Sequence, residues 1–192
     1  MRFYDVDGGS ILVDGVDTKE MTRHELRDRF GMVLQDAWLF EGSIRDNIAY
    51  AQDNLPEEKI IAAARSASVD SFIKTLPGGY DFELSTGAEN ISQGQRQLLT
   101  IARAMASDPE IMILDEATSN VDTHTEQLIQ KALAKLMHGR TSFVIAHRLS
   151  TIRDADMILY MEHGDILEHG SHEELMAQHG KYEALYMSQF AQ

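Results

Sequence analysis

The sequence contains no cysteine, which excludes disulfide bonds and thiolate-ligated metal centres. Long hydrophobic runs are also missing, and the apolar stretches fall far short of the roughly 20 residues that a transmembrane helix needs. Residues 1–5 are not followed by the apolar segment of a secretory signal peptide. These absences predict an intracellular domain that does not itself cross a membrane.

Positive charge is scarce as well. Lysine and arginine number 17 against 31 aspartate and glutamate, which gives a formal net charge of −14 and a pI near 4.8. Because nucleic-acid phosphates are bound by basic surfaces, we expect no nucleic-acid partner. At 192 residues with 43% hydrophobic composition, the chain is long enough for one domain, which we expect to span residues 1–192.

The segment 108–119 carries the clearest chemical pattern. Ile111–Leu114 is an unbroken apolar run that follows Pro109, and it predicts a strand buried on both faces of a parallel sheet. Asp115 and Glu116 come at its carboxyl end, where open α/β sheets bind their ligands. One carboxylate can hold Mg²⁺ and the other can act as a base on water. The alternative is that the two acids merely end a strand at the surface.

Strands and helices alternate along the chain, which predicts an α/β fold with a mostly parallel sheet. Residues 1–7 resemble the tail of a helix. We expect strands at 8–15, 30–34, 111–114 and 141–145, and a hairpin from 157–161 and 165–167. We expect helices at 21–30, within 57–75, from Ser92 to before Pro109, from Thr123 to before Gly139, and at about 171–178 and 180–189.

Several helix ends have recognisable capping residues. Thr22 is a candidate N-cap, and both Ser92 with Gln95 and Thr123 with Glu126 have the spacing of a capping box.

Polar side chains follow three of the expected strands: Gln35, then Asp115 with Glu116, then His147. Taken alone, the glutamine reads as a surface residue and the histidine as a structural one. Parallel strands end at the same edge of a sheet, so their coincidence predicts a shared site.

Residues 37–40 place three large apolar side chains in an expected loop. Two interpretations remain open at this point. The cluster could cover an edge of the sheet, or it could be a docking surface for another protein.

Five motifs, in order, resemble the nucleotide-binding domain of an ATP-binding cassette (ABC) transporter of the bacterial multidrug and lipid exporter type. Residues 111–116 resemble the Walker B strand with its glutamate, and 90–97 resemble the ABC signature. Residues 33–36 resemble the Q-loop, 119–122 the D-loop and 146–151 the switch-histidine segment. The resemblance covers essentially the whole chain. It implies a P-loop NTPase-like sheet with a helical subdomain at roughly 50–100.

The resemblance also implies roles for the residues at the strand ends. Asp115 would hold Mg²⁺ through water, and Gln35 would reach the same ion or the attacking water. Glu116 would act as general base, and His147 would contact the γ-phosphate of ATP. ATP hydrolysis coupled to export of a substrate is the activity that this set implies.

Further implied sites concern partners. Ser92, Gln93, Gly94 and Gln95 would bind the γ-phosphate of ATP held by a second nucleotide-binding domain, in a homo- or heterodimer, and Asp122 would organise that contact. The segment Trp38–Asn47 would receive the coupling helices of the transmembrane domain. The domain would lie at the cytoplasmic face of a bacterial membrane.

The sequence also departs from the family pattern. It has no Walker A loop, Gly-x-x-x-x-Gly-Lys-[Ser/Thr], because no lysine has that context (Lys19, Lys59, Lys74, Lys131, Lys135, Lys181). In the family this loop and the first strand of the sheet lie just upstream of the position of Met1. Gln93 replaces a usual glycine, and 84–89 lacks the usual Val-Gly-Glu.

Without that loop and strand, we expect the chain alone to be inactive and to expose apolar surface. Two alternatives stay open. The chain could be a degenerate cassette that completes a partner's ATP site, or a soluble ABC ATPase that does not take part in transport.

Overall fold

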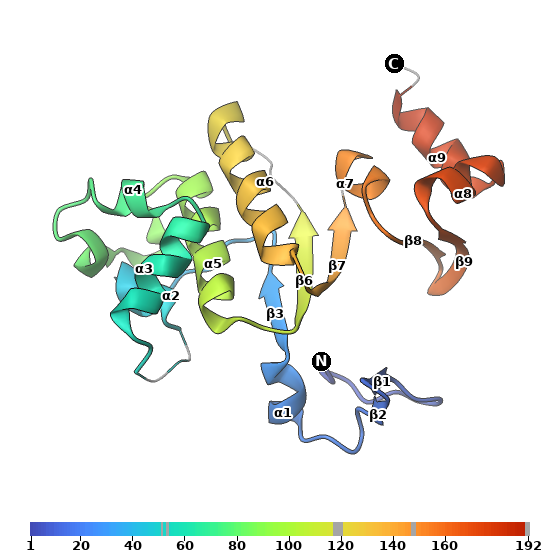
Figure 1. The fold of residues 1–192 in the computed structure, drawn as a ribbon, viewed down its shortest axis with the longest axis horizontal. Coiled ribbons are helices and arrows are strands. Elements are labelled where there is room, and N and C mark those ends of the chain that lie inside the picture. The colour runs from blue at the N-terminus through green and yellow to red at the C-terminus, as the bar shows by residue number, and fades with distance from the viewer. Residues whose placement is uncertain (51, 53, 117–120, 147–148, 191–192) are drawn as a thin grey trace. The chain divides into compact units, whose positions relative to one another are not determined.

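The computed structural model describes residues 1–50, 52, 54–116, 121–146 and 149–190. Contacts within the chain divide it into two compact units, Met1–Val144 and Ile145–Gln192, and each is described here by itself. Figure 1 shows the order of the elements along the chain. None of the described helices combines the length and the apolar composition that crossing a bilayer requires.

The first unit alternates short strands with helices. Its strands are β1 (Leu12–Val13), β2 (Val16–Asp17), β3 (Phe30–Val33), β4 (Gly42–Ser43), β5 (Glu83–Leu84), β6 (Ile111–Glu116) and most of β7 (Thr141–Ala146). Its helices are α1 (Arg23–Asp28), α2 (Ile44–Ile48), α3 (Glu57–Ser66), α4 (Asp70–Ile73), α5 (Gln93–Ser107) and α6 (Thr123–Met137), with 3₁₀ turns η1 (Gly79–Asp81) and η2 (Thr86–Ala88).

The main sheet has the strand order β3-β6-β7, and β3 and β6 run parallel with Val33 opposite Leu114. Side chains alternate between its faces. Val33, Met112 and Leu114 are buried in the hydrophobic core, whereas Met32 and Phe143 on the other face are exposed. The predicted mixed α/β fold with a parallel sheet is confirmed. The expectation that 111–114 is buried on both faces is wrong, because Ile111 and Ile113 on the second face are only half-buried by the described residues.

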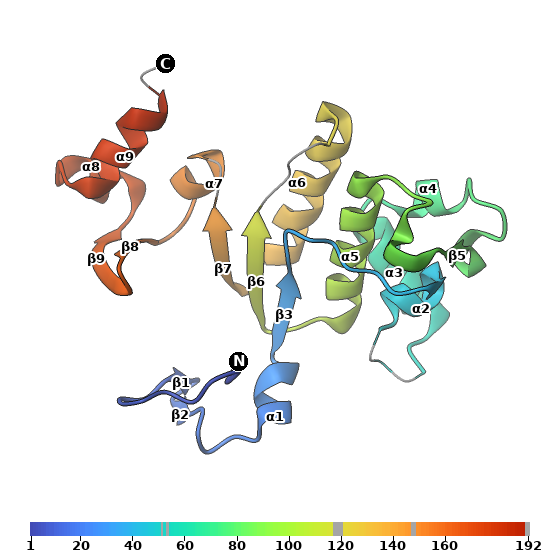
Figure 2. The same cartoon turned by 180° about the vertical axis from the view of Figure 1, so that it is seen from behind.

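Helix α5 is the centre of the helical part. It contacts α6, α2, α3 and β3, and the two views of the ribbon show α2 and α3 on the side of α5 away from the sheet (Figures 1 and 2). An apolar stripe makes this possible: Leu98, Leu99, Ile101 and Ala102 are all buried. That residues 50–100 form a subdomain of their own stays a prediction.

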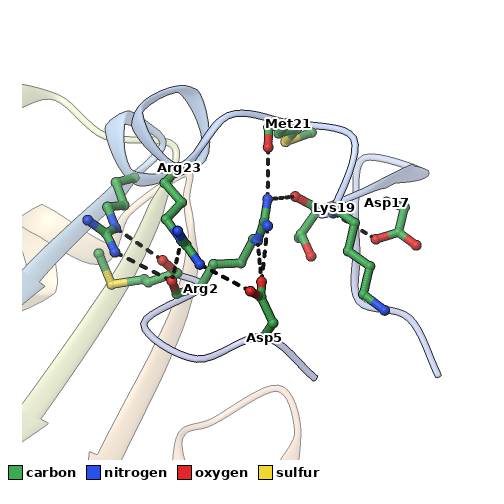
Figure 3. Close-up of polar contacts among 9 residues, drawn as sticks. Arg2, Asp5, Asp17, Lys19, Met21 and Arg23 are labelled. Atoms are coloured by element: carbon green, nitrogen blue, oxygen red, sulfur yellow. Dashed lines mark hydrogen bonds and ion pairs between the residues drawn. The ribbon is translucent and has the colours of Figure 1, made fainter. Parts of the chain in front are cut away.

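The N-terminal segment is not helical, contrary to expectation. Arg2 has a φ of 48°, outside the helical range, and its side chain fixes the segment in place of helical hydrogen bonds. Its guanidinium donates to the carbonyls of Thr18 and Met21, each at 2.9 Å, and pairs with Asp5 at 3.0 Å (Figure 3). Arg23 bonds Asp5 as well, at 3.1 Å, so this segment is tied to the start of α1.

The predicted capping is largely confirmed. Thr22 caps α1 and Ser92 caps α5, each with a complete capping box. The prediction for α6 is wrong by one residue: Asp122 is the N-cap, and its carboxylate accepts from the Thr125 N–H at 3.0 Å. The expected strand at 8–15 shrinks to the two residues of β1, because the glycines around it form turns.

The second unit holds α7 (Leu149–Arg153), the antiparallel hairpin β8 (Ile158–Glu162) and β9 (Asp165–Gly170), α8 (His172–Ala177) and α9 (Lys181–Phe190). His163 and Gly164 both have positive φ, as a two-residue hairpin turn requires. Glu168 caps α9 by accepting from the backbone N–H groups of Lys181 and Tyr182. The expected hairpin and closing helices are confirmed.

Candidate functional site

The carboxyl ends of β3 and β6 lie at one edge of the sheet, because the two strands are paired in parallel. Asp115 and Glu116 are the last two residues of β6, which extends two residues beyond the end that the sequence predicted. Gln35 follows the end of β3 and is exposed, and Asp115 is half-buried. The predicted neighbours Gln35 and Asp115–Glu116 therefore share this edge. His147, the third predicted member, lies outside the described residues.

The donor set at this edge suits magnesium bound together with a nucleotide. Among the described residues no three histidine or acidic side chains converge as a metal cage. Mg²⁺ needs no such cage, since it commonly takes one or two protein oxygens and completes its shell with water and phosphate. Asp115 offers a carboxylate and Gln35 an amide oxygen, which are ligands of that kind.

The N-terminus of α5 is a second polar feature. Ser92 is exposed, and its hydroxyl accepts from the Gln95 N–H while the Gln95 side chain accepts from the Ser92 N–H at 2.9 Å. Both partners belong to the same turn. The 15-residue helix therefore presents its positive end to the surface, as anion-binding helix ends do.

Gly94 brings a second helix start beside this end. A Cβ at Gly94 would lie 2.3 Å from Cγ2 of Thr125 and 3.1 Å from Cγ1 of Val121, so the backbones approach closely. Asp122 caps the neighbouring α6, and hydrogen bonds from the Thr125 and His124 N–H groups help hold the pKa of its carboxyl below the usual range. The segments around Ser92 and Asp122 thus form one surface.

The segment before the signature connects two parts of the first unit. β5 pairs with β4, so Leu84 lies opposite Gly42. The hydroxyl of Thr86 donates to the Glu41 carboxylate at 2.5 Å, and the Arg96 guanidinium donates to the carbonyl of Gly87 at 3.0 Å. The segment that departs from the family's usual sequence is therefore bonded both to the loop at 37–43 and to α5.

The loop at 37–40 supports the covering interpretation through one side chain, while the docking interpretation stays a prediction. Leu39 is buried in the core with 2% exposure, so one side chain covers the interior. Trp38 is 60% exposed and packs against Phe40 at 6.2 Å and the half-exposed Tyr50 at 6.1 Å between ring centroids. We call Trp38, Phe40 and Tyr50 the aromatic patch. Exposed clustered rings are characteristic of protein contacts.

A small cavity near the N-terminus is separate from these residues. It has a volume of about 60 Å³ and is lined by residues between Met1 and Phe30, among them Arg2, Asp5 and Lys19. A small-molecule site typically needs about 300 Å³ or more. None of the predicted site residues lines it, so it is not the expected nucleotide site.

Comparison with known proteins decides the family. Residues 1–119 match the protein family described as ABC transporter. The chain belongs to the ABC transporter family. Strands β3 and β6, the α5 signature turn and Asp115 all fall within the matched residues, whereas Asp122 and His147 lie beyond them.

Relatives of this ABC transporter chain include proteins named for a fatty acid transporter and for a lipid A-core flippase. It is 54% identical over 182 residues to the "Fatty acid ABC transporter ATP-binding/permease protein" of Mycobacterium tuberculosis (strain CDC 1551 / Oshkosh), covering 95% of this chain and 29% of the relative. It is 50% identical over 188 residues to the "ATP-dependent lipid A-core flippase" of Desulfotalea psychrophila (strain LSv54 / DSM 12343), covering 98% of this chain and 33% of that protein.

A solved structure agrees. The "Structure of a bacterial Atm1-family ABC exporter with ATP bound" matches with a TM-score of 0.88 and 41% identity, over 98% of this chain and 33% of that one. The chain therefore spans about a third of the length of the relatives it matches. Its fold is that of an ABC exporter's nucleotide-binding domain.

Sequence reasoning missed the residues that hold the aromatic patch. Arg103 and Asn47 are bonded to each other across 56 positions of sequence. An arginine in an amphipathic helix normally reads as a solvated cation, and no local pattern signals its distant partner. The burial of Asn47, which is 0% exposed, is equally invisible in sequence.

Proposed function

We propose that this chain is part of the ATP-hydrolysing domain of an ABC exporter, and that its α5 signature turn binds the γ-phosphate of ATP held by a second cassette. The observation that carries the proposal is the surface formed by two adjacent helix starts, at Ser92 and at Asp122. Family membership and the likeness to a solved ABC exporter support ATP-driven export as the process.

The strand edge supplies the hydrolytic groups in this proposal. Glu116 accepts a proton from water as the water oxygen bonds to the γ-phosphorus and the bond to the β,γ-bridging oxygen breaks. Gln35 and Asp115 would hold Mg²⁺, and the ion would supply positive charge to the phosphates when bound. His147 donates to the γ-phosphate. Such positioning supplies most of the catalysis in phosphoryl transfer.

The signature turn acts on the partner's nucleotide. In the free chain the Ser92 hydroxyl accepts from the Gln95 N–H. A phosphate that binds at this exposed helix end replaces the Ser92 hydroxyl as the acceptor for backbone N–H groups of the first turn. The Ser92 hydroxyl then rotates and donates to a phosphate oxygen. Gln93 and Gln95 flank the phosphate, and Asp122 holds the neighbouring helix start in place.

The aromatic patch is the proposed docking surface for the membrane part. The relatives' names join an ATP-binding and a permease function in one protein. A partly exposed cluster of three rings within the segment 38–50 offers a rigid apolar seat for a helix from such a part, at the cytoplasmic face of the membrane.

We infer that the chain by itself does not hydrolyse ATP, because none of its lysines has the context of a phosphate-binding Gly-rich loop. A second candidate is a cassette that only completes a partner's site. The intact capping box at Ser92 supports it equally well, since this turn needs no catalytic residue of its own chain.

A chimaera tests the proposal. This chain replaces the matching 29% of the mycobacterial relative, which supplies the remaining sequence, and MgATP hydrolysis is measured. We expect hydrolysis by the chimaera, loss of hydrolysis with retained binding for Glu116→Gln, and no MgATP binding to the chain alone by calorimetry. Normal hydrolysis by the Glu116→Gln chimaera would contradict the catalytic assignment. Tight Mg²⁺-dependent binding to the chain alone would contradict its inactivity.

If the chimaera is inactive but stimulates hydrolysis by an intact second cassette, the completing role is favoured. In that case Ser92→Arg removes the stimulation, because a long cationic side chain blocks the signature turn.

A further inference from the structure

Arg103 lies on α5, the helix that begins at the signature turn, yet its side chain is committed to the segment 38–47. Its Nε donates to the Asn47 carbonyl at 2.7 Å, and Nη1 donates to the Trp38 carbonyl at 3.1 Å. Nη2 donates to Oδ1 of Asn47 at 3.0 Å. All three acceptors belong to the proposed docking segment, so the planar fork of the guanidinium fixes both ends of it.

The same guanidinium lies against the aromatic patch. Its carbon is 4.9 Å from the Tyr50 ring centroid and 5.8 Å from that of Trp38. The two rings meet edge to face at 78°. Arg103 is thus a common support for two exposed aromatic side chains, through cation–π contacts that are worth more when the cation is desolvated.

The positive charge of Arg103 makes its hydrogen bonds and ring contacts with the segment specific. Burial lowers the pKa of Arg103, although a guanidinium stays protonated at neutral pH. No described carboxylate forms an ion pair with it. The partly buried cation is therefore satisfied by two carbonyls, one side-chain amide oxygen and two ring faces. A displacement of the segment breaks hydrogen bonds to the partly buried Arg103 guanidinium. The free-energy cost of leaving this cation without acceptors opposes the displacement.

Asn47 extends the support. Its Nδ2 donates to the carbonyls of Phe40 and Ser43, each at 3.0 Å, and its Oδ1 accepts from the Phe40 N–H at 3.1 Å as well as from Arg103. Arg103 and Asn47 together hold the backbone on both sides of Leu39, whose side chain is buried in the core.

We propose that Arg103 is the positioning residue that fastens the docking segment 38–47 and the aromatic patch to the signature helix, so that a partner seated on the patch moves the signature turn with it. The inference rests on the proposed function for what the patch binds. It assigns the direct connection between the two surfaces to Arg103, beside the indirect route through Thr86 and Arg96.

Trp38 is the single tryptophan of the chain, which makes it a probe of this connection. We compare the wild-type chain with Arg103→Gln, Arg103→Lys and the matched control Arg96→Gln. Arg96 lies on the same helix but bonds the Gly87 carbonyl. The readouts are acrylamide quenching of Trp38 and amide hydrogen exchange of residues 38–50, with circular dichroism as a check on folding.

Arg103→Gln is expected to raise the quenching of Trp38 and to speed exchange in 38–50 by roughly tenfold, the effect of losing one or two hydrogen bonds. Arg103→Lys keeps the charge but loses the fork, and is expected to speed exchange by a smaller factor while restoring the fold if Arg103→Gln unfolds. Arg96→Gln is expected to change both readouts less than Arg103→Gln does, because its bond to Gly87 reaches the loop at 37–43 only through the segment 84–89. Wild-type quenching and exchange in both Arg103 variants would overturn the proposal.

A second readout separates this inference from the docking proposal. In the chimaera, a cysteine at Glu41 is cross-linked to cysteines in the permease part, which is possible because this chain has no cysteine of its own. If Trp38→Ala abolishes cross-linking and Arg103→Lys lowers the stimulation of hydrolysis by transported substrate without changing the KM for ATP, both proposals are supported.

If Trp38→Ala leaves cross-linking intact, docking at the patch is wrong, whereas the Trp38 quenching result still decides the role of Arg103. If Trp38→Ala abolishes cross-linking but the Arg103 variants respond to substrate as wild type does, the docking surface stands and the role of Arg103 is overturned.

Discussion

The two halves of helix α5 are held in opposite ways. At its start, Ser92 and Gln95 bond only within their own turn, and the serine is exposed. Towards its end, Arg103 bonds Trp38 and Asn47, which are distant in sequence. The capping box at the start is self-contained and open to a ligand, while Arg103 forms a joint between segments.

This difference separates two reasons for placing polar residues on one helix. A capped helix end keeps its hydrogen bonds local, so a phosphate can replace them at little cost in folding energy. A buried joint cannot exchange its partners without leaving a charge or an amide unsatisfied. Substitutions at the joint should therefore change folding stability, whereas substitutions at the helix start should change nucleotide-dependent behaviour.

The largest expected effect is at the joint. Asn47→Ala removes four hydrogen bonds at a position with no exposure and takes away the acceptor of the Phe40 N–H and of the Arg103 Nη2. We expect a loss of about 3 kcal/mol in the free energy of unfolding, measured by urea denaturation. Asp36→Ala, an exposed change in the same loop, should cost less than about 0.5 kcal/mol. Equal effects of the two substitutions would mean that Asn47 is not a joint.

Gly94→Ala tests how closely the two helix starts pack. Helix propensity alone would stabilise the chain by about 1 kcal/mol. The new methyl meets Thr125 at 2.3 Å, so we expect a net destabilisation of about 1–2 kcal/mol instead. Adding Thr125→Ser, which removes the contacting Cγ2 and keeps the hydroxyl, should recover much of the loss. Gly8→Ala, with open space around it, is the control. If Gly94→Ala is more stable than the wild type, the starts of α5 and α6 lie further apart than in the structure.

Ser92→Ala should affect folding only modestly. Removing an N-cap costs about 1 kcal/mol in the free energy of unfolding. Ser92→Thr keeps the hydroxyl, so its free energy of unfolding should stay within a few tenths of a kcal/mol of the wild-type value. Thermal unfolding followed by circular dichroism measures both. A loss in Ser92→Ala as large as that in Asn47→Ala would remove the distinction between the two halves of α5.

The smallest effect near neutral pH is electrostatic. Hydrogen bonds from Lys74 and Tyr80 hold the pKa of Asp70 below its usual value, and the Thr125 N–H does so for Asp122. Because these folded-state pKa values lie below the unfolded ones, their stabilisation is complete above about pH 4 and is lost as pH falls through the folded values. Urea unfolding from pH 7 to pH 2 should show this decline, and Asp70→Asn should make it shallower. An unchanged slope in that variant would exclude Asp70 as a source.

Local features were predictable from sequence and distant ones were not. Thr22 and Ser92 can be recognised as N-caps from sequence, because a capping box involves only residues three positions apart. The apolar run 111–114 predicted a strand with acidic residues at its end, since an apolar run and its flanking residues are enough to identify a strand. The helix start at Asp122 was misplaced by one residue because threonine and aspartate are both good caps and the sequence offered both in succession.

Tertiary contacts decide the remainder. Arg2 replaces the expected helical turn of residues 1–7 with side-chain bonds to Thr18 and Met21, which no spacing rule anticipates. The exposure of Phe143 depends on which elements cover each face of the sheet. Of the candidate site, sequence identified the types of residue and their order along the chain. It did not reveal that Gly94 packs against Thr125, or that Arg103 joins α5 to the segment around Trp38.

The most direct test of the central claim compares two serines with the same local structure. Ser92 and Ser171 each cap a helix through a complete capping box, and only Ser92 belongs to the proposed phosphate site. In the chimaera carrying Glu116→Gln, ATP retained after gel filtration is measured with Ser92→Arg or Ser171→Arg added. The account predicts that retention falls by more than about tenfold, the equivalent of roughly 1.4 kcal/mol, for Ser92→Arg and is unchanged for Ser171→Arg. Equal retention in the two variants would contradict a phosphate-binding role for the start of α5.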